Sequence, residues 1–185
     1  MRKIHRLLSS CRRGYFKYLY LCTLNHKIRK IRRKETIRVL FAVAESATWK
    51  NDSLYRAMLM HPGFTPLILV LPDEQKEESL KREGVDTCFD FFRNKGYTCS
   101  YPYENGKLIN IRKALNPDII FYQKPYTYYP ESFLYRRNLN ALFCYTNYAF
   151  HSLLADWANK NDFFQLVWQN YYENESAFTD LKRKY

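Results

Sequence analysis

The sequence predicts an α/β fold, in which a doubly wound parallel sheet of about five strands follows a basic amphipathic helical arm. Three observations predict it. Short apolar runs alternate with helical stretches from residue 36 onward, a pattern typical of parallel sheets. At 46% hydrophobic residues, the chain can bury a core. Finally, residues 1–34 hold twelve of the 30 basic residues and no acidic one. We therefore expect an arm over residues 1–34 and one α/β domain over residues 35–185.

The arm is expected to form a helix that lies on an anionic membrane surface without crossing it. Its apolar residues from Ile4 to Cys22 recur at steps of three and four, and tyrosine rings among them suit a headgroup interface. The longest apolar stretch, residues 15–24, is far shorter than the ~20 residues that span a bilayer. A helix packed on its own domain, or a frayed terminus, is the alternative. The basic residues expected to contact the membrane are Arg2, Lys3, Arg6, Arg12, Arg13, Lys17, Lys27, Arg29, Lys30, Arg32, Arg33 and Lys34.

The later elements are predicted from residue patterns. Apolar runs that are too short for buried helices predict strands. They cover residues 37–44, 65–71, 97–101, 119–122 and 141–145. Helical spacing and cap residues predict helices between these strands. The helices cover residues 53–60, with Leu54, Ala57 and Met58 facing inward, residues 74–95, which end at Gly96, residues 107–115 and 131–138, and much of residues 150–182.

Strands that alternate with helices form parallel sheets with helices on both faces. Right-handed crossovers then predict a Rossmann-like or flavodoxin-like order, in which the pair of strands 2-1 is flanked by strand 3 and by strands 4-5. Ligands of such sheets bind beyond the carboxyl ends of the strands. The loops at residues 45–50, 123–126 and 146–148 are therefore the expected site.

Composition argues against several kinds of site and partner. The five glycines lie far apart, which excludes the glycine clusters of dinucleotide-binding and P-loop sites. Neither the five cysteines nor the four histidines have the spacing of a metal site, so we expect no metal and no cofactor. Outside the arm, 18 basic residues balance 18 acidic ones, so a nucleic-acid partner is disfavoured.

Several segments of the body resemble one bacterial family. The similar segments follow one another in order along residues 36–180, and they include Ser46-Ala-Thr-Trp-Lys50, Asn116-Pro-Asp-Ile-Ile-Phe-Tyr-Gln-Lys-Pro-Tyr126 and Tyr145-Thr-Asn-Tyr-Ala-Phe150. On these segments the chain resembles the N-terminal half of the CDP-glycerol glycerophosphotransferase-like glycosyltransferases, which build bacterial cell-envelope polymers such as teichoic acids and capsules.

The resemblance implies a GT-B arrangement, in which two Rossmann-like domains enclose the active site. This chain would supply the acceptor-side domain and would be inactive alone, because the second domain carries most contacts to the donor. The expected partners are an anionic membrane surface, a lipid-linked polymer acceptor and, only with a donor-binding half, a nucleotide-activated donor similar to CDP-glycerol. The expected location is peripheral, at the cytoplasmic face of the bacterial inner membrane.

The three loops and the resemblance together supply the candidate site residues. Glu45 and His151 are the candidate catalytic bases, because a carboxylate or an imidazole can take a proton from an acceptor hydroxyl. Among the other candidates, the indole of Trp49 can stack on a sugar, and Lys50 and Lys124 can bind phosphate. The neutral polar side chains can form hydrogen bonds with glycerol phosphate. Each of these residues also has a structural alternative, as a surface acid, a packed ring, a solvated lysine or a strand cap. The candidate substrate-binding residues are Ser46, Trp49, Lys50, Gln123, Lys124, Tyr126, Thr146, Asn147 and Tyr148.

Two other functions remain open on the sequence. A membrane-tethered, flavodoxin-like interaction module without catalysis would have the same fold and arm. An RNA-binding protein would use the basic arm, although the apolar stripe of that arm suits lipid better than phosphate.

Overall fold

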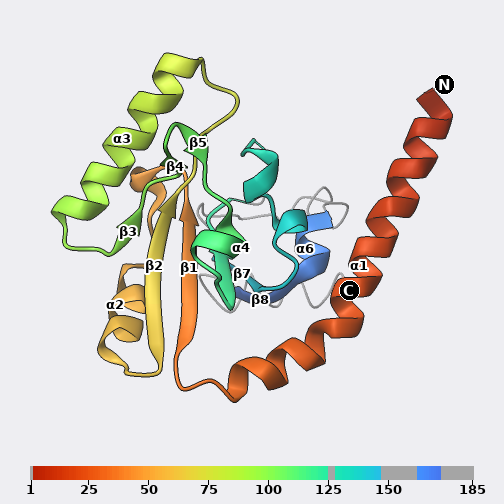
Figure 1. Ribbon diagram of the computed structural model, residues 1–185, viewed down its shortest axis with the longest axis horizontal. Coiled ribbons are helices and arrows are strands. Elements are labelled where there is room, and N and C mark those ends of the chain that lie inside the picture. The colour runs from red at the N-terminus through yellow and green to blue at the C-terminus, as the bar shows by residue number, and fades with distance from the viewer. Residues whose placement is uncertain (1, 125–127, 147–161, 172–185) are drawn as a thin grey trace, which may run out of the picture.

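The computed structural model describes residues 2–124, 128–146 and 162–171, and their centre is a six-stranded parallel sheet with helices on both faces (Figure 1). Neighbouring strands follow the order β3-β2-β1-β6-β7-β8. The expected α/β fold with a doubly wound parallel sheet is therefore confirmed. The strands are β1 (Ile37–Val43), β2 (Phe64–Val70), β3 (Cys99–Ser100), β6 (Ile119–Tyr122), β7 (Leu142–Thr146) and β8 (Val167–Tyr171).

The strand order is that of a Rossmann-like sheet. Counted along the chain, the sheet strands lie in the order 3-2-1-4-5-6, so the pair 2-1 is flanked by strand 3 and by strands 4-5 as expected. The flavodoxin-like alternative is wrong, because it would place the third strand on the other side of the first. The sheet also has a sixth strand, β8, which lies within the stretch 150–182 that was expected to be mainly helical.

The sheet separates two apolar layers. Val39, Phe41 and Val43 of β1 point to one face, which helices α2 and α3 cover, whereas Leu40 and Ala42 point to the other face. Helices α4 and α6 and the part of α1 around Tyr20 lie on that second face (Figure 1), whereas Ile28 and Ile31 near the end of α1 pack against the first layer. The helices are α1 (Arg2–Arg32), α2 (Asp52–Met60), α3 (Glu78–Asn94), α4 (Ile111–Ala114) and α6 (Asp162–Leu166), and there are 3-10 turns η1 (Ser46–Thr48), η2 (Glu131–Phe133) and η3 (Tyr135–Arg137).

The second half of α1 packs on the body, while its first half extends away from the sheet (Figure 1). Tyr20 is 1% exposed, and its ring stacks on Phe143 with the ring centroids 5.1 Å apart. Leu24 packs against both apolar layers, and Ile31 is buried. This half of the expected arm is therefore part of the folded domain, and the helix ends at Arg32.

A β-hairpin replaces the start of the helix expected at residues 107–115. Strands β4 (Tyr103–Glu104) and β5 (Lys107–Leu108) pair antiparallel, and only α4 is helical in this region. Asn105 and Gly106 join the two strands with φ angles of 51° and 74°. An Asn-Gly pair favours this two-residue turn because both residues tolerate positive φ. The pair is the local signal that the helical interpretation overlooked.

Three other helices differ from expectation in extent or facing. Residues 131–138 form η2 and η3 instead of one helix, because Leu134 between them is extended, with ψ at 149°. Tyr55 is the buried residue of α2, whereas Ala57, expected to face inward, is exposed. Helix α3 begins at Glu78, four residues later than expected, and the turn before it is fixed by the Gln75 N–H, which donates to the Asp73 carboxylate.

Candidate functional site

The carboxyl ends of β1 and β6 are locked together by Gln123. This side chain is 4% exposed, and both of its amide atoms have partners. The Ala44 N–H donates to Gln123 Oε1 (3.2 Å), and Gln123 Nε2 donates to the Glu45 carbonyl (3.1 Å). Since both polar atoms are engaged, the geometry gives Gln123 a positioning role: it fixes the loop that carries Glu45.

Glu45 and Lys124 form an ion pair at this same edge. Lys124 Nζ lies 2.8 Å from Glu45 Oε2, and the Glu45 side chain is 39% exposed. The Glu45 carbonyl also accepts a hydrogen bond from the Thr48 hydroxyl at 3.1 Å, which holds the loop as the turn η1. The structure therefore brings together an accessible carboxylate, which can accept a proton, and a cation, which can bind phosphate.

Trp49 lies away from this pair, in the apolar layer under α2 and α3. Its indole meets Phe41, Phe92 and Tyr97 edge-on, with ring centroids 5.3–5.9 Å apart. Indole Nε1 donates to the Tyr97 hydroxyl at 3.3 Å, and that hydroxyl in turn donates to Asp52. These contacts give Trp49 a structural role: the ring packs over the sheet, which is the alternative to stacking on a sugar.

Of the remaining candidates, two follow β1, one ends β7, and four lie outside the residues that the structure describes. Ser46 begins η1 next to Glu45, and Lys50 is exposed just before α2. Thr146 ends β7, and its hydroxyl is buried without a hydrogen-bond partner among the residues described. Four candidates, Tyr126, Asn147, Tyr148 and His151, lie outside the described residues.

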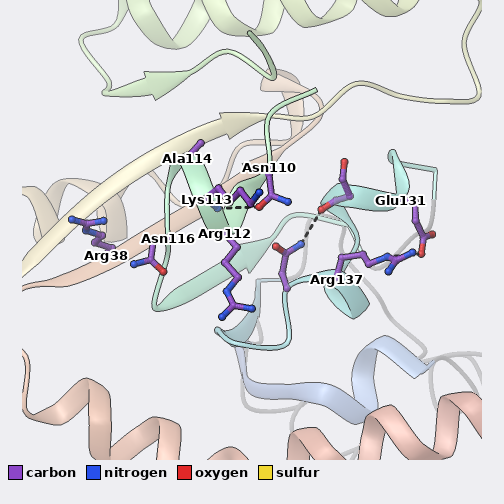
Figure 2. Close-up of a pocket in the computed structure, with 10 residues that line it drawn as sticks. Arg38, Asn110, Arg112, Lys113, Ala114, Asn116, Glu131 and Arg137 are labelled. Carbon is purple, nitrogen blue, oxygen red and sulfur yellow. Dashed lines mark hydrogen bonds and ion pairs between the residues drawn. The ribbon is translucent and has the colours of Figure 1, made fainter. Parts of the chain in front are cut away.

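A second candidate site is an open pocket of about 970 Å³ near the amino end of β1 (Figure 2). Arg38 of β1, Arg112 and Lys113 of α4, and Arg137 of η3 line it, together with one carboxylate, Glu131. Figure 2 shows the Arg112 guanidinium reaching from α4 into the space beside the turns η2 and η3, while Arg137 turns toward Glu131. The pocket is therefore strongly cationic.

The single carboxylate of the pocket is already engaged. Arg136 Nε and Arg137 Nε donate to Glu131 Oε1 at 3.1 and 3.2 Å. The hydrogen bond from Arg136, more than any other contact, lowers the pKa of the Glu131 carboxyl. No carboxylate among the described residues pairs with the side chains of Arg38, Arg112 or Lys113.

This pocket was not predicted from the sequence, because the site was expected only at the carboxyl ends of the strands. One local signal was present: Arg38 is the only charged residue in the otherwise apolar strand Ile37–Val43. Its side chain points to the same face as Leu40 and Ala42, the face on which α4 lies. No spacing rule could have shown that α4 brings Arg112 and Lys113 to the same cavity.

The outward side of α1 is a third candidate surface. Tyr15, Tyr18 and Leu19 are 59%, 66% and 38% exposed, and the last two follow Tyr15 by three and four positions along the helix. The basic residues Arg29 and Lys30 are exposed further along it. In the residues that the structure describes, no helix combines the length and the apolar character needed to cross a bilayer.

The described residues offer no group of three His, Cys, Asp or Glu side chains that could hold a metal ion. The comparisons identify no relative: no family model matches the chain, and neither a curated protein nor a solved structure matches it.

Proposed function

We propose that this chain is the acceptor-side domain of a membrane-associated glycerophosphotransferase or glycosyltransferase of bacterial cell-envelope polymer synthesis. It acts peripherally at the cytoplasmic face of the inner membrane and needs a donor-binding half to complete its active site. The resemblance of residues 36–180 suggests the reaction. The observation that carries the proposal is the two-sided helix α1, with one side docked on the body and the other exposed.

The two sides of α1 have separate roles. Tyr20, Leu24 and Ile31 hold the helix on the body. Tyr15 and Leu19 point away from the body, because residues on a helix are 100° apart: Tyr15 is about half a turn from the docked positions and Leu19 about a third of a turn. A helix with exposed aromatic and aliphatic groups next to exposed arginine and lysine binds anionic lipid headgroups. The attachment holds the domain where a lipid-linked acceptor is found.

At the carboxyl edge of the sheet, Glu45 and Lys124 supply the chemistry expected on the acceptor side. The acceptor hydroxyl gives its proton to the Glu45 carboxylate as its oxygen forms a bond to phosphorus, and the bond from phosphorus to the leaving nucleotide oxygen breaks. Lys124, 2.8 Å from Glu45, balances the negative charge of the phosphoryl group. The donor half binds the nucleotide.

The test incubates the chain with CDP-glycerol and a lipid-linked glycerol phosphate acceptor in phosphatidylglycerol vesicles. The expected result is that the chain sediments with the vesicles and releases no CMP, because the donor site is incomplete. Robust transfer by this chain alone would contradict the half-enzyme assignment. Failure to sediment with acceptor-containing vesicles would contradict the acceptor-side assignment.

A further inference from the structure

We infer that the pocket between β1, α4 and η3 binds a phosphate-bearing ligand through Arg38, Arg112 and Lys113. This inference rests on the pocket alone and not on the proposed function. The pocket is separate from the carboxyl edge, because Arg38 is the second residue of β1, whereas Glu45 follows the end of that strand.

The pocket gathers basic side chains. Arg38, Arg112 and Lys113 come from two elements far apart in the sequence and line one cavity, and no carboxylate of the described residues pairs with them. Like charges gathered in a concave site repel one another, and the site focuses their field on any anion that enters. Guanidinium and ammonium groups together match the oxygens of a phosphate group.

Several cations elsewhere in the molecule do have carboxylate partners. Arg56 of α2 pairs with Asp52 at 2.9 Å, Arg82 of α3 pairs with Glu78 at 3.1 Å, and Lys81 pairs with Glu74 at 3.0 Å. Helix α4 offers no such carboxylate, since its sequence from Ile111 to Ala114 contains no acidic residue. No acidic residue of α4 therefore neutralises Arg112 and Lys113.

The pocket is large, and hydrogen bonds fix one of its walls. A volume of about 970 Å³ is at the upper end of the usual range for small-molecule sites and far exceeds one phosphate ion. The wall at η2 and η3 is fixed by Asn138, which is 2% exposed and donates through Nδ2 to the carbonyls of Ser132 (3.2 Å) and Leu134 (2.9 Å). The ligand therefore consists of a phosphate group and a larger polar part.

The pocket lies near the end of α1. Asp118 accepts hydrogen bonds from Lys34 Nζ (2.6 Å), just after α1, and from the Arg38 N–H (3.1 Å). The pocket is thereby fixed beside the basic end of α1. The phosphate group can belong to a soluble molecule or to a lipid headgroup, and these two sources share the same recognition chemistry.

The experiment measures binding of inorganic pyrophosphate to the full chain by isothermal titration calorimetry. The pocket variant is Arg112→Gln with Lys113→Gln. The control variant is Lys107→Gln with Arg93→Gln, which removes equal charge from the exposed hairpin and from α3. We expect saturable binding that weakens about tenfold or more in the pocket variant and by less than about twofold in the control. Equal weakening in both variants, or no saturable binding by the wild type, would overturn the inference.

Two further variants and a sedimentation assay complete the test. The charge-conserving variant Arg112→Lys keeps pyrophosphate binding if the cation matters, and Arg38→Gln repeats the loss should the pocket variant fail to fold. Sedimentation with phosphatidylglycerol vesicles then separates the sources. A pocket variant that loses pyrophosphate but keeps vesicle binding assigns the site to a soluble phosphate, and one that loses both assigns it to a headgroup. A pocket variant that binds pyrophosphate as the wild type does contradicts both assignments.

Discussion

Lys27 lies where α1 meets the body, with Nζ 3.8 Å from the centroid of the Tyr20 ring. Its ammonium is buried and has no hydrogen-bond partner among the described residues. Burial lowers the pKa of Lys27 to about 8. The contact with the ring offsets part of the cost of burying the charge. This residue, expected from the sequence to face a membrane, instead faces its own domain.

The Lys27→Met variant is expected to be more stable than the wild type at pH 7, because it removes a buried charge. In the unfolded chain Lys27 keeps its proton up to about pH 10.4. Between pH 8 and that value, the folded wild type has released the proton while the unfolded chain still holds it. The free energy of unfolding of the wild type therefore rises with pH over this range. The difference in free energy of unfolding between the variant and the wild type should therefore become smaller from pH 7 to pH 10.

Urea unfolding at several pH values measures this gap, with Lys30→Met, an exposed position of the same helix, as the control. The control should show no such narrowing. A constant gap for Lys27→Met across this pH range would contradict the account.

Tyr20 connects α1 to an irregular point of the sheet. The pairing of β7 with β8 shifts register between Phe143 and Cys144, and the Phe143 N–H donates to the Tyr20 hydroxyl at 3.2 Å. Tyr20→Phe leaves this buried N–H unpaired and should destabilise the fold by about 1–3 kcal/mol. Tyr18→Phe, at a position 66% exposed, should change stability by less than about 0.5 kcal/mol. Equal effects in urea unfolding would show that the Tyr20 hydroxyl does not secure the helix.

Among the helices, α1 has one side that packs on the body and another that is exposed. Replacing Tyr15 and Leu19 by Ser removes apolar area from the outward side without touching the docked side. We expect partitioning to phosphatidylglycerol vesicles to weaken about fivefold or more, because the buried apolar area sets much of the binding strength. Serine at Leu59 and Met60 of α2, which are 51% and 84% exposed, is the matched control. Equal loss in both variants would contradict the role of α1.

The elements also show how far the sequence determines the fold. The strands Ile37–Val43 and Ile119–Tyr122 were predictable, because buried parallel strands have short continuous apolar runs. The strand Val167–Tyr171 was not, since it lies at the sheet edge with only half-buried or exposed side chains, and its strandlike pattern is weak. The hairpin around Asn105 and Gly106 was predictable from the turn residues and was overlooked.

The candidate site was predictable in part. Parallel strands bring their carboxyl ends to one edge, so the meeting of Glu45, Gln123 and Lys124 follows from the strand assignments. The cationic pocket did not follow, because Arg38 and Arg112 meet only through the packing of α4 on the sheet. Trp49 turned inward because an indole gains more from four neighbouring rings than from water.

At the scale of the molecule, a body with no net charge is strongly polarised. Residues 73–90, which lead into α3 and form most of it, carry seven acidic and three basic residues. The cationic pocket lies on the other face of the sheet. A dipole of this kind orients the domain on an anionic surface with α3 turned away. The attraction should weaken as salt screens it, so vesicle binding should fall between 50 and 500 mM NaCl.

As proposed above, this domain holds a lipid-linked, phosphate-rich acceptor at a membrane surface. The most direct test compares its affinity for two vesicle populations of equal surface charge in a sedimentation assay. One contains a lipid-linked glycerol phosphate oligomer in phosphatidylcholine, and the other contains only phosphatidylcholine and phosphatidylglycerol. We predict binding about tenfold tighter to the first population, because it offers the acceptor as well as the charge. Equal affinity for both would contradict the claim and leave only a charge-driven attachment.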